Sequence, residues 1–160
     1  MAKSIAAQLK QKRAFSSREQ EVLLAVRMAA ARLTAPWAQF LKSTADLSTS
    51  QYNVLRILRG SPEGGLTCGE IGERTVARDP DITRLVDRLC KRGLVKRIRS
   101  QTDRRVVQVE ITQKGLDLLD DLDPHVERLP PALLGHMSQT SLQQLSRLLS
   151  QLLEGTGTFP

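Results

Sequence analysis

The sequence predicts a mainly α-helical chain of the α+β class, in which helices flank one two-stranded β-hairpin. Apolar residues recur at helical spacing through most of the chain, and capping patterns mark the starts of several helices. Two short segments on either side of residues 100–105 alternate apolar and polar side chains, which is typical of strands. The 160 residues suffice for one domain, or for one domain with a dimerisation region.

The chain is expected to be soluble and cytoplasmic. It has no apolar run long enough to cross a membrane, and its N-terminus lacks the apolar core of a signal peptide. Cys68 and Cys90 fall on predicted helices and are expected to be free thiols, because structural disulfides are rare in the cytoplasm.

The N-terminal part predicts a basic arm followed by a long helix. Residues 1–17 contain four Lys or Arg and no acidic residue, which indicates a solvated tail or loosely docked helix, or alternatively an arm that contacts DNA. Helical periodicity then begins at residue 18, and we assign 18–47 to a dimerisation helix. Pro36 should break or bend this helix, because proline removes a backbone N–H donor.

Two capping boxes predict the next two helices. Ser48 with Gln51, and Thr67 with Glu70, have the spacing in which each side chain bonds the other residue's backbone N–H. We expect the second of these helices to cover about 68–75.

The segment from Asp79 to Gly93 predicts a third helix. Asp79 suits the N-cap, Pro80 suits the first helical position, and Gly93 suits the position after the helix. Residues 76–78 remain as a three-residue turn, the length that joins the helices of a helix-turn-helix. Apolar residues at i, i+3, i+4 and i+7 form one buried stripe: Ile82, Leu85, Val86 and Leu89.

A hairpin follows this helix. Residues 94–99 and 106–111 read as strands, and 100–105 form a polar tip. Helix, turn, helix and hairpin together make 48–112 a winged helix-turn-helix domain.

The C-terminal part predicts further dimerisation helices over 113–154 and a frayed tail over 155–160. Pro124 should bend the first of these helices, and Pro130-Pro131 should interrupt it. Ser138 is a suitable N-cap for a last, leucine-rich helix.

The positive charge is concentrated in the winged region. Residues 74–105 hold eleven Lys or Arg against four Asp, a balance of +7. The whole chain has 24 basic and 17 acidic residues, so the remainder holds 13 of each. A surplus confined to one helix and one hairpin indicates a surface that binds phosphate groups.

Four motifs stand in order between Leu66 and Gly115. They are Asp81-Ile82-Thr83-Arg84-Leu85-Val86-Asp87-Arg88-Leu89, Arg92-Gly93-Leu94-Val95, Asp103-Arg104-Arg105 and Ile111-Thr112-Gln113-Lys114-Gly115. This run resembles the multiple antibiotic resistance regulator (MarR) family. The resemblance implies that the terminal helices of two chains interleave into a homodimer, and that a small-molecule pocket lies between these helices and the DNA-binding part.

We expect DNA contacts from the exposed side of the third helix and from the hairpin. Arg84 should reach a guanine edge or a phosphate, unless it only pairs with an acidic neighbour. Thr83 contacts a thymine methyl or base edge, or merely flanks the helix. Asp81 either complements the helix dipole or accepts from cytosine. Arg99 and Arg104 meet phosphates or only solvent. The full set is Asp81, Thr83, Arg84, Arg88, Arg99, Arg104 and Arg105.

The resemblance assigns roles to Arg105 and to four further side chains. It implies that Arg105 enters the minor groove and that Asp103 supports it through a charge-assisted hydrogen bond. It also places Trp37, Phe40 and Tyr52 on the elements that would contact an aromatic or phenolic ligand. Alternatively, these three aromatic side chains belong to the core.

No enzyme and no cofactor are expected, because the sequence has no phosphate-binding loop, nucleophile elbow or metal-ligand spacing. We therefore expect a homodimeric transcriptional repressor that binds palindromic double-stranded DNA and is released by a small molecule. The alternatives are a redox-sensing regulator that uses Cys68 or Cys90, and a protein-interaction adaptor that uses its winged domain to dock an acidic partner.

Overall fold

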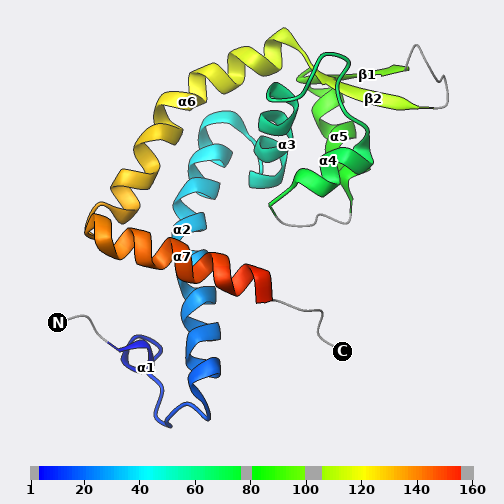
Figure 1. Ribbon diagram of the computed structural model, residues 1–160. Helices are drawn as coiled ribbons and strands as arrows, with labels where there is room; N and C mark the ends of the chain where they lie inside the picture. Colours follow the sequence, from blue (N-terminus) through cyan, green and yellow to red (C-terminus); the bar gives the residue numbers. More distant parts are fainter. Residues whose placement is uncertain (1–3, 77–80, 100–105, 156–160) are drawn as a thin grey trace. The chain divides into compact units, whose positions relative to one another are not determined.

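Helices dominate the structure (Figure 1). The computed structural model describes residues 4–76, 81–99 and 106–155. The mainly α-helical class is confirmed, and α3, α4 and α5 with the hairpin form a winged helix-turn-helix. The elements are, in order, α1 (Ile5–Gln8), α2 (Arg18–Ala45), α3 (Thr49–Arg59), α4 (Cys68–Arg74), α5 (Ile82–Lys91), β1 (Val95–Arg99), β2 (Val107–Ile111), α6 (Gln113–Leu134) and α7 (Gln139–Gly155).

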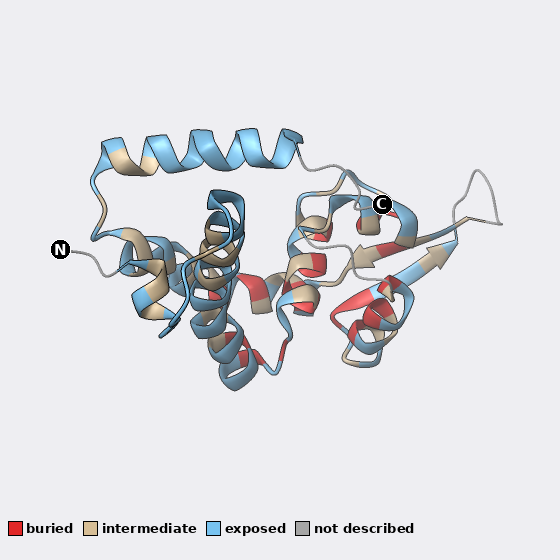
Figure 2. Ribbon diagram, turned by 90° about the horizontal axis from the view of Figure 1, so that it is seen from below, coloured by how far each residue is buried: buried red, intermediate tan, exposed pale blue. Residues whose placement is uncertain are grey.

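The chain divides into two compact units, Met1–Asp121 and Leu122–Pro160. The buried apolar side chains of the first unit lie between Leu41 and Leu119, where Figure 2 shows the red segments. Within this unit α3 contacts α2, α4, α5 and β2. α3 is therefore the central helix of the core that supports the exposed side of α5.

The long helix α2 is continuous. Its N-cap is Ser17, whose hydroxyl accepts a hydrogen bond from the Gln20 N–H at 3.2 Å. The predicted break at Pro36 is wrong, since the helix passes through the proline. Pro36 is exposed, so water can bond the carbonyl that lacks its N–H partner, and the φ of proline is itself helical. In the arm, Gln8 of α1 accepts a hydrogen bond from Arg32 of α2 at 2.7 Å, so this part of the arm is docked.

Both capping boxes are confirmed. The Ser48 hydroxyl accepts from the Gln51 N–H at 3.1 Å, and the Gln51 side chain accepts from the Ser48 N–H at 2.9 Å. Thr67 and Glu70 make the equivalent pair at 3.2 and 2.8 Å. These reciprocal bonds satisfy backbone donors that a helix start otherwise leaves open, and they fix where α3 and α4 begin.

The helix α5 begins two residues later than predicted. Its N-cap is Asp81, whose carboxylate accepts from the Arg84 N–H at 3.3 Å, so the prediction that Asp79 caps this helix is wrong. Asp81 directly precedes Ile82, the first residue of the buried stripe. The cap that lies next to the packed face sets the start, because burial of that face drives helix formation.

The helix α4 ends one residue before its predicted end. α4 ends at Arg74 because Thr75 has an extended backbone. Of the predicted three-residue turn, 76–78, only Val76 lies within the described residues. Residues 77–80, which include the expected cap and the proline after it, lie outside the described residues.

The predicted end of α5 at Gly93 is confirmed. Gly93 has a φ of +70°, a left-handed conformation that favours glycine. Its N–H bonds the Cys90 carbonyl at 2.9 Å, and the Leu94 N–H bonds the Leu89 carbonyl at 3.0 Å. These two bonds form a Schellman motif, which turns the chain directly into β1.

The hairpin is antiparallel. β1 pairs with β2 in a register that sets Val95 opposite Ile111 and Lys96 opposite Glu110. Leu66, which precedes α4, forms a bridge with Val109 of β2. Both apolar residues of this bridge are buried, so the base of the hairpin belongs to the core.

The helix α6 runs from Gln113 to Leu134 without interruption. The predicted interruption at Pro130-Pro131 is wrong, and the helix also continues through Pro124. All three prolines are exposed, so water can satisfy the freed carbonyls, as at Pro36 of α2. The predicted cap of α7 is confirmed, since the Ser138 hydroxyl accepts from the Ser141 N–H at 3.1 Å.

The start of α6 packs directly on the turn after α5. The Thr112 hydroxyl donates to the Gly93 carbonyl at 2.7 Å and accepts from the Gly115 N–H at 3.2 Å. A Cβ on Gly115 would lie 2.3 Å from the Leu94 carbonyl oxygen and 2.7 Å from the Ile111 side chain. There is no room for a larger residue unless the backbone shifts.

A Gly115→Ala substitution should therefore lower the free energy of unfolding by about 1–3 kcal/mol, the usual cost of overpacking. Chemical denaturation of the full-length protein measures this loss. Gly69→Ala is the control, because the nearest atom to its added Cβ is 3.8 Å away and alanine is the better helix former. Equal stability of the two variants would contradict the tight packing at the start of α6.

Candidate nucleic-acid interface

One side of α5 is exposed and basic. Thr83, Arg84, Arg88 and Lys91 are exposed, whereas the apolar stripe on the opposite side is buried. Arg84, Arg88 and Lys91 are spaced i, i+4 and i+7, so they project from the same side of the helix. This spacing makes a row of cations about two turns long.

The carboxylate of Asp81 holds the first of these cations. Besides capping α5, Asp81 forms an ion pair with the Arg84 guanidinium at 3.2 Å. The Arg84 side chain is nevertheless 78% exposed. Asp81 therefore orients Arg84 at the surface without burying it. Arg88 and Lys91 form no ion pair with any residue that the structure describes.

The hairpin is tied to α5 by charge. Arg97 of β1 forms an ion pair with Asp87 of α5 at 2.6 Å. On the hairpin itself, Lys96 and Glu110 pair across the strands at 3.0 Å. Arg99 ends β1 and is exposed. The Asp87–Arg97 pair fixes the base of the wing against the exposed helix, a contact that the sequence did not indicate.

Three of the expected site residues belong to the tip of the wing. Asp103, Arg104 and Arg105 lie outside the residues that the structure describes. Of the expected DNA contacts, the structure brings Asp81, Thr83, Arg84 and Arg88 together on α5.

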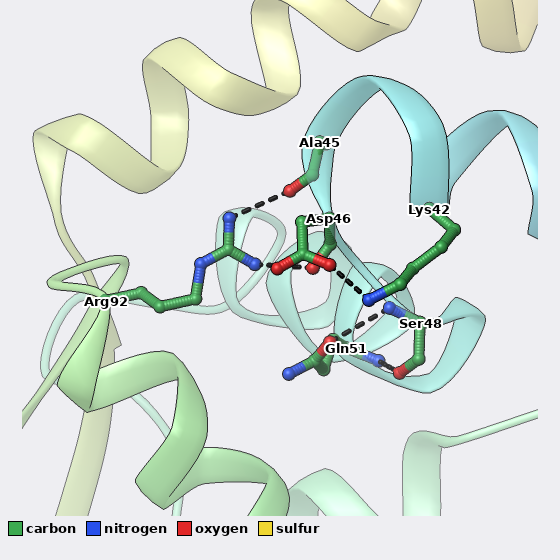
Figure 3. Close-up of polar contacts among 6 residues, drawn as sticks. All are labelled: Lys42, Ala45, Asp46, Ser48, Gln51 and Arg92. Atoms are coloured by element: carbon green, nitrogen blue, oxygen red, sulfur yellow. Dashed lines mark hydrogen bonds and ion pairs between the residues drawn. The ribbon is translucent and has the colours of Figure 1, made fainter.

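Arg92 joins the end of α5 to the end of α2 (Figure 3). Its guanidinium donates to the carbonyls of Ala45 and Asp46, each at 2.8 Å. Asp46 is in a left-handed conformation, with a φ of 48° and a ψ of 41°. The Lys42 ammonium bonds the Asp46 carboxylate and holds the pKa of that carboxyl below its ordinary value. Because these contacts join residues more than 40 positions apart, no local pattern could have indicated them.

The three aromatic side chains expected at a ligand site do meet. Trp37 stacks on Phe40 with ring centroids 5.4 Å apart, and it meets the edge of Tyr52 at 5.0 Å. Tyr52 is buried, and the other two are half-buried. The cluster joins α2 to α3, so it suits both packing and contact with an aromatic compound.

None of the described helices is long and apolar enough to span a membrane. Across the described residues, no group of His, Cys, Asp and Glu is arranged to hold a metal ion.

Comparison with known proteins agrees with this geometry. A family model described as MarR family matches residues 45–106. The chain is similar to a MarR transcription factor of known crystal structure from Planctomyces limnophilus, with 40% identity, a TM-score of 0.64, and coverage of 86% of this chain and 99% of that chain. The structure of Sco3205 from Streptomyces coelicolor, a MarR family regulator in complex with DNA, has the same fold at 20% identity, with a TM-score of 0.77 and coverage of 92% and 94%. The transcriptional repressor IacR from Pseudomonas putida is 29% identical over 128 residues, which are 80% of this chain and 75% of that protein.

Two free thiols lie near the exposed helix. Cys68 starts α4, Cys90 lies on α5, and both are half-buried. Burial raises the pKa of the Cys90 thiol above its ordinary value. Because the thiolate is the reactive form, Cys90 should be a slow nucleophile at neutral pH.

This shift predicts the pH dependence of alkylation in a Cys68→Ser variant, in which Cys90 is the remaining thiol. At pH about 7, iodoacetamide should react more slowly with Cys90 in the folded protein than in the unfolded protein, and the difference should narrow as the pH rises through the raised pKa. Mass spectrometry of the two time courses measures both rates. Equally fast alkylation of the folded protein at neutral pH would contradict this prediction and favour the redox-sensing alternative.

Proposed function

This chain belongs to the MarR family of transcriptional regulators, and we propose that it is a homodimeric repressor that binds a palindromic operator through α5 and the wing. The observation that carries the proposal is the exposed basic side of α5. Its cations stand on a buried apolar stripe, so the core presents them to a partner. The DNA complex of Sco3205 and the repressor activity in the name of IacR support the same function here.

In this proposal α5 enters the major groove and its side chains have separate tasks. Arg84 reads a guanine edge, and Asp81 orients it through the ion pair. Thr83 contacts a thymine methyl, and Arg88 contacts a phosphate. Since base contacts specify a site and phosphate contacts position the protein, Arg84 should contribute most to sequence preference.

The wing has a different task. We assign phosphate contacts to Arg99 and Arg104, and entry into the minor groove to Arg105 with support from Asp103. The Asp87–Arg97 pair supports this assignment, because it holds the base of the wing in a fixed position relative to α5.

The terminal helices, 18–47 and 113–154, supply the proposed dimer contacts. Exposed apolar side chains on α2 and α7 support this assignment, because a large exposed apolar surface often marks a protein–protein interface. A two-fold dimer would present two copies of α5 to the two halves of a palindrome. The exposed residues are Val22, Leu23 and Leu33 on α2, and Leu145, Leu148, Leu149, Leu152 and Leu153 on α7.

Release of the operator is assigned to a small aromatic or phenolic ligand. The cluster of Trp37, Phe40 and Tyr52 supports this step, because it joins the long helix α2 to the DNA-binding part. A ligand can regulate only if it binds one separation of the two DNA-binding parts more tightly than another. Contact with these rings would give it that preference.

Selection from random duplex DNA tests the function. It should enrich a palindrome whose binding weakens steeply as the salt concentration rises. Arg84→Ala should cost about 1–3 kcal/mol and relax the preference at one base pair of each half-site, because it removes a bidentate contact. A panel of duplexes with single base-pair changes measures both effects.

Arg56→Ala is the matched control for that experiment, since it removes an exposed arginine of α3 outside the proposed interface. If Arg84→Ala weakens every duplex equally, Arg84 contacts only phosphate. If the selection enriches no particular sequence, the repressor function is rejected and the protein-interaction adaptor is favoured.

The dimer has a separate test in sedimentation. The wild-type chain should sediment at twice its monomer mass. Leu149→Glu should weaken dimerisation by more than about tenfold, because a carboxylate would be buried without a partner. Gln144→Glu adds the same charge at an exposed polar position of α7 and should leave the dimer intact. A monomeric wild type at micromolar concentration would refute the dimer.

A further inference from the structure

A recess opens beside the basic side of α5, within the first unit. Its volume is about 650 Å³, and it lies between the end of α2, the start of α3 and the second half of α5. A smaller recess of about 140 Å³ shares Ser48 and Arg88 with it. The aromatic cluster of Trp37, Phe40 and Tyr52 does not line either recess, so this is a different site from the proposed ligand contact.

The larger recess is strongly basic. Four cationic side chains line it against one carboxylate: Lys42, Arg88, Lys91 and Arg92 against Asp46. Lys42 pairs with Asp46, and Arg92 donates to backbone carbonyls (Figure 3). Arg88 and Lys91 have no ion pair within the described part of the chain. The recess therefore holds two cations whose charge is not balanced by a nearby carboxylate.

The amide of Gln51 also lines the recess. The Gln51 residue is only 9% exposed. Its oxygen accepts from the Ser48 N–H at 2.9 Å, while its nitrogen points away from Ser48 in Figure 3 and donates to none of the described residues. Because the Nε2 atom of Gln51 is accessible to solvent and carries two N–H donors, it can donate to an anion in the recess.

The N-terminus of α3 adds further positive potential to the recess. Ser48 and Thr49 line the recess, and the first N–H groups of a helix carry partial positive charge. An anion in the recess would thus meet two side-chain cations, one amide donor and a helix N-terminus. A carboxylate side chain that could repel it, Asp46, is already bonded to Lys42.

We propose that this recess binds a single phosphate-type oxyanion, held by Arg88, Lys91 and the amide of Gln51. The anion is either free phosphate or a phosphate ester of the DNA backbone, since Arg88 stands on the exposed side of α5 next to the recess. The site goes beyond the proposed repressor function and does not depend on it, because phosphate alone can be titrated.

The direct test follows the side-chain amide signal of Gln51 by nuclear magnetic resonance. The full-length, ¹⁵N-labelled protein is titrated with inorganic phosphate against chloride at constant ionic strength. The Gln51 amide and the backbone amides of Thr49 and Ser50 should shift and saturate together. Shifts that do not saturate would overturn the proposal.

One substitution separates the anion site from the capping box. Gln51→Glu keeps an oxygen that accepts from Ser48, and glutamate suits this capping position equally well. It replaces the free donor with a second carboxylate oxygen, so phosphate affinity, followed on the backbone amides, should fall more than about tenfold while thermal unfolding stays unchanged.

Two charge-removing substitutions, one in the recess and one outside it, test whether the positive charge of the recess binds the anion. Lys91→Gln should weaken phosphate binding more than about fivefold, whereas Arg56→Gln, which removes one cation elsewhere, should change it less than about twofold. Equal effects of the two substitutions would show that phosphate responds only to net charge, and the site would be rejected.

A last measurement identifies the source of the anion. If the recess takes a DNA phosphate, inorganic phosphate should weaken duplex binding by the wild type relative to chloride, and Gln51→Glu should weaken it without phosphate. If the recess takes free phosphate beside bound DNA, duplex affinity should be the same in both salts. Either result supports the recess only if the amide signals also shift and saturate in the phosphate titration. If the protein binds no duplex DNA, the phosphate titration alone decides whether the recess binds an anion.

Discussion

Two hydrogen bonds from the Arg92 guanidinium to the last carbonyls of α2 hold the C-terminal end of α5. The end of a helix leaves four carbonyls without partners, and Arg92 satisfies two backbone acceptors at the place where the left-handed Asp46 turns the chain toward α3. One residue further on, Gly93 ends α5, and the backbone of Leu94 bonds both to α5 and to Thr112, just before α6. The exposed helix, the long helix, the hairpin and the start of α6 therefore meet at one junction. The direction in which α5 projects depends on it.

The acidic and basic side chains of α5 are separated along the helix. Its two carboxylates are both engaged: Asp81 caps the helix and orients Arg84, and Asp87 holds Arg97 at the base of the wing. Among the described residues, neither carboxylate forms an ion pair with Arg88 or Lys91. Negative charge thus positions the candidate interface at the start of α5 and at the hairpin, while the cations in the second half of α5 have no ion-pair partner among the described residues. Exposed ion pairs contribute little stability, so their main effect here is geometric.

Features set by residues close in sequence could be predicted, and features set by distant ones could not. The capping boxes at Ser48 and Thr67 and the glycine end of α5 depend on neighbouring residues, and they were correct. The start of α5 was misplaced because Asp79 and Asp81 both suit an N-cap, and the choice depends on packing. The predicted break at Pro36 and interruption at Pro130-Pro131 were wrong because proline is compatible with a helical φ, and its cost is small where water reaches the free carbonyl. Arg92 looked like one more cation of the charged window, although its partners lie on α2.

These contacts restrict how a regulator built on this chain can respond. α2 is joined to α5 through Arg92 and to α3 through the aromatic cluster, so the three helices should move together. We call α2, α3 and α5 of one chain, with the hairpin, a lobe. Repositioning α5 within its lobe would break the charge-assisted hydrogen bonds of Arg92 and expose buried leucines. Moving the lobe of one chain relative to the lobe of the other would keep these bonds and this burial. In the proposed dimer, a ligand that contacts α2 would therefore act on the separation of the two α5 helices and not on the shape of either lobe. Since a palindrome requires one separation, a small change would suffice to weaken binding.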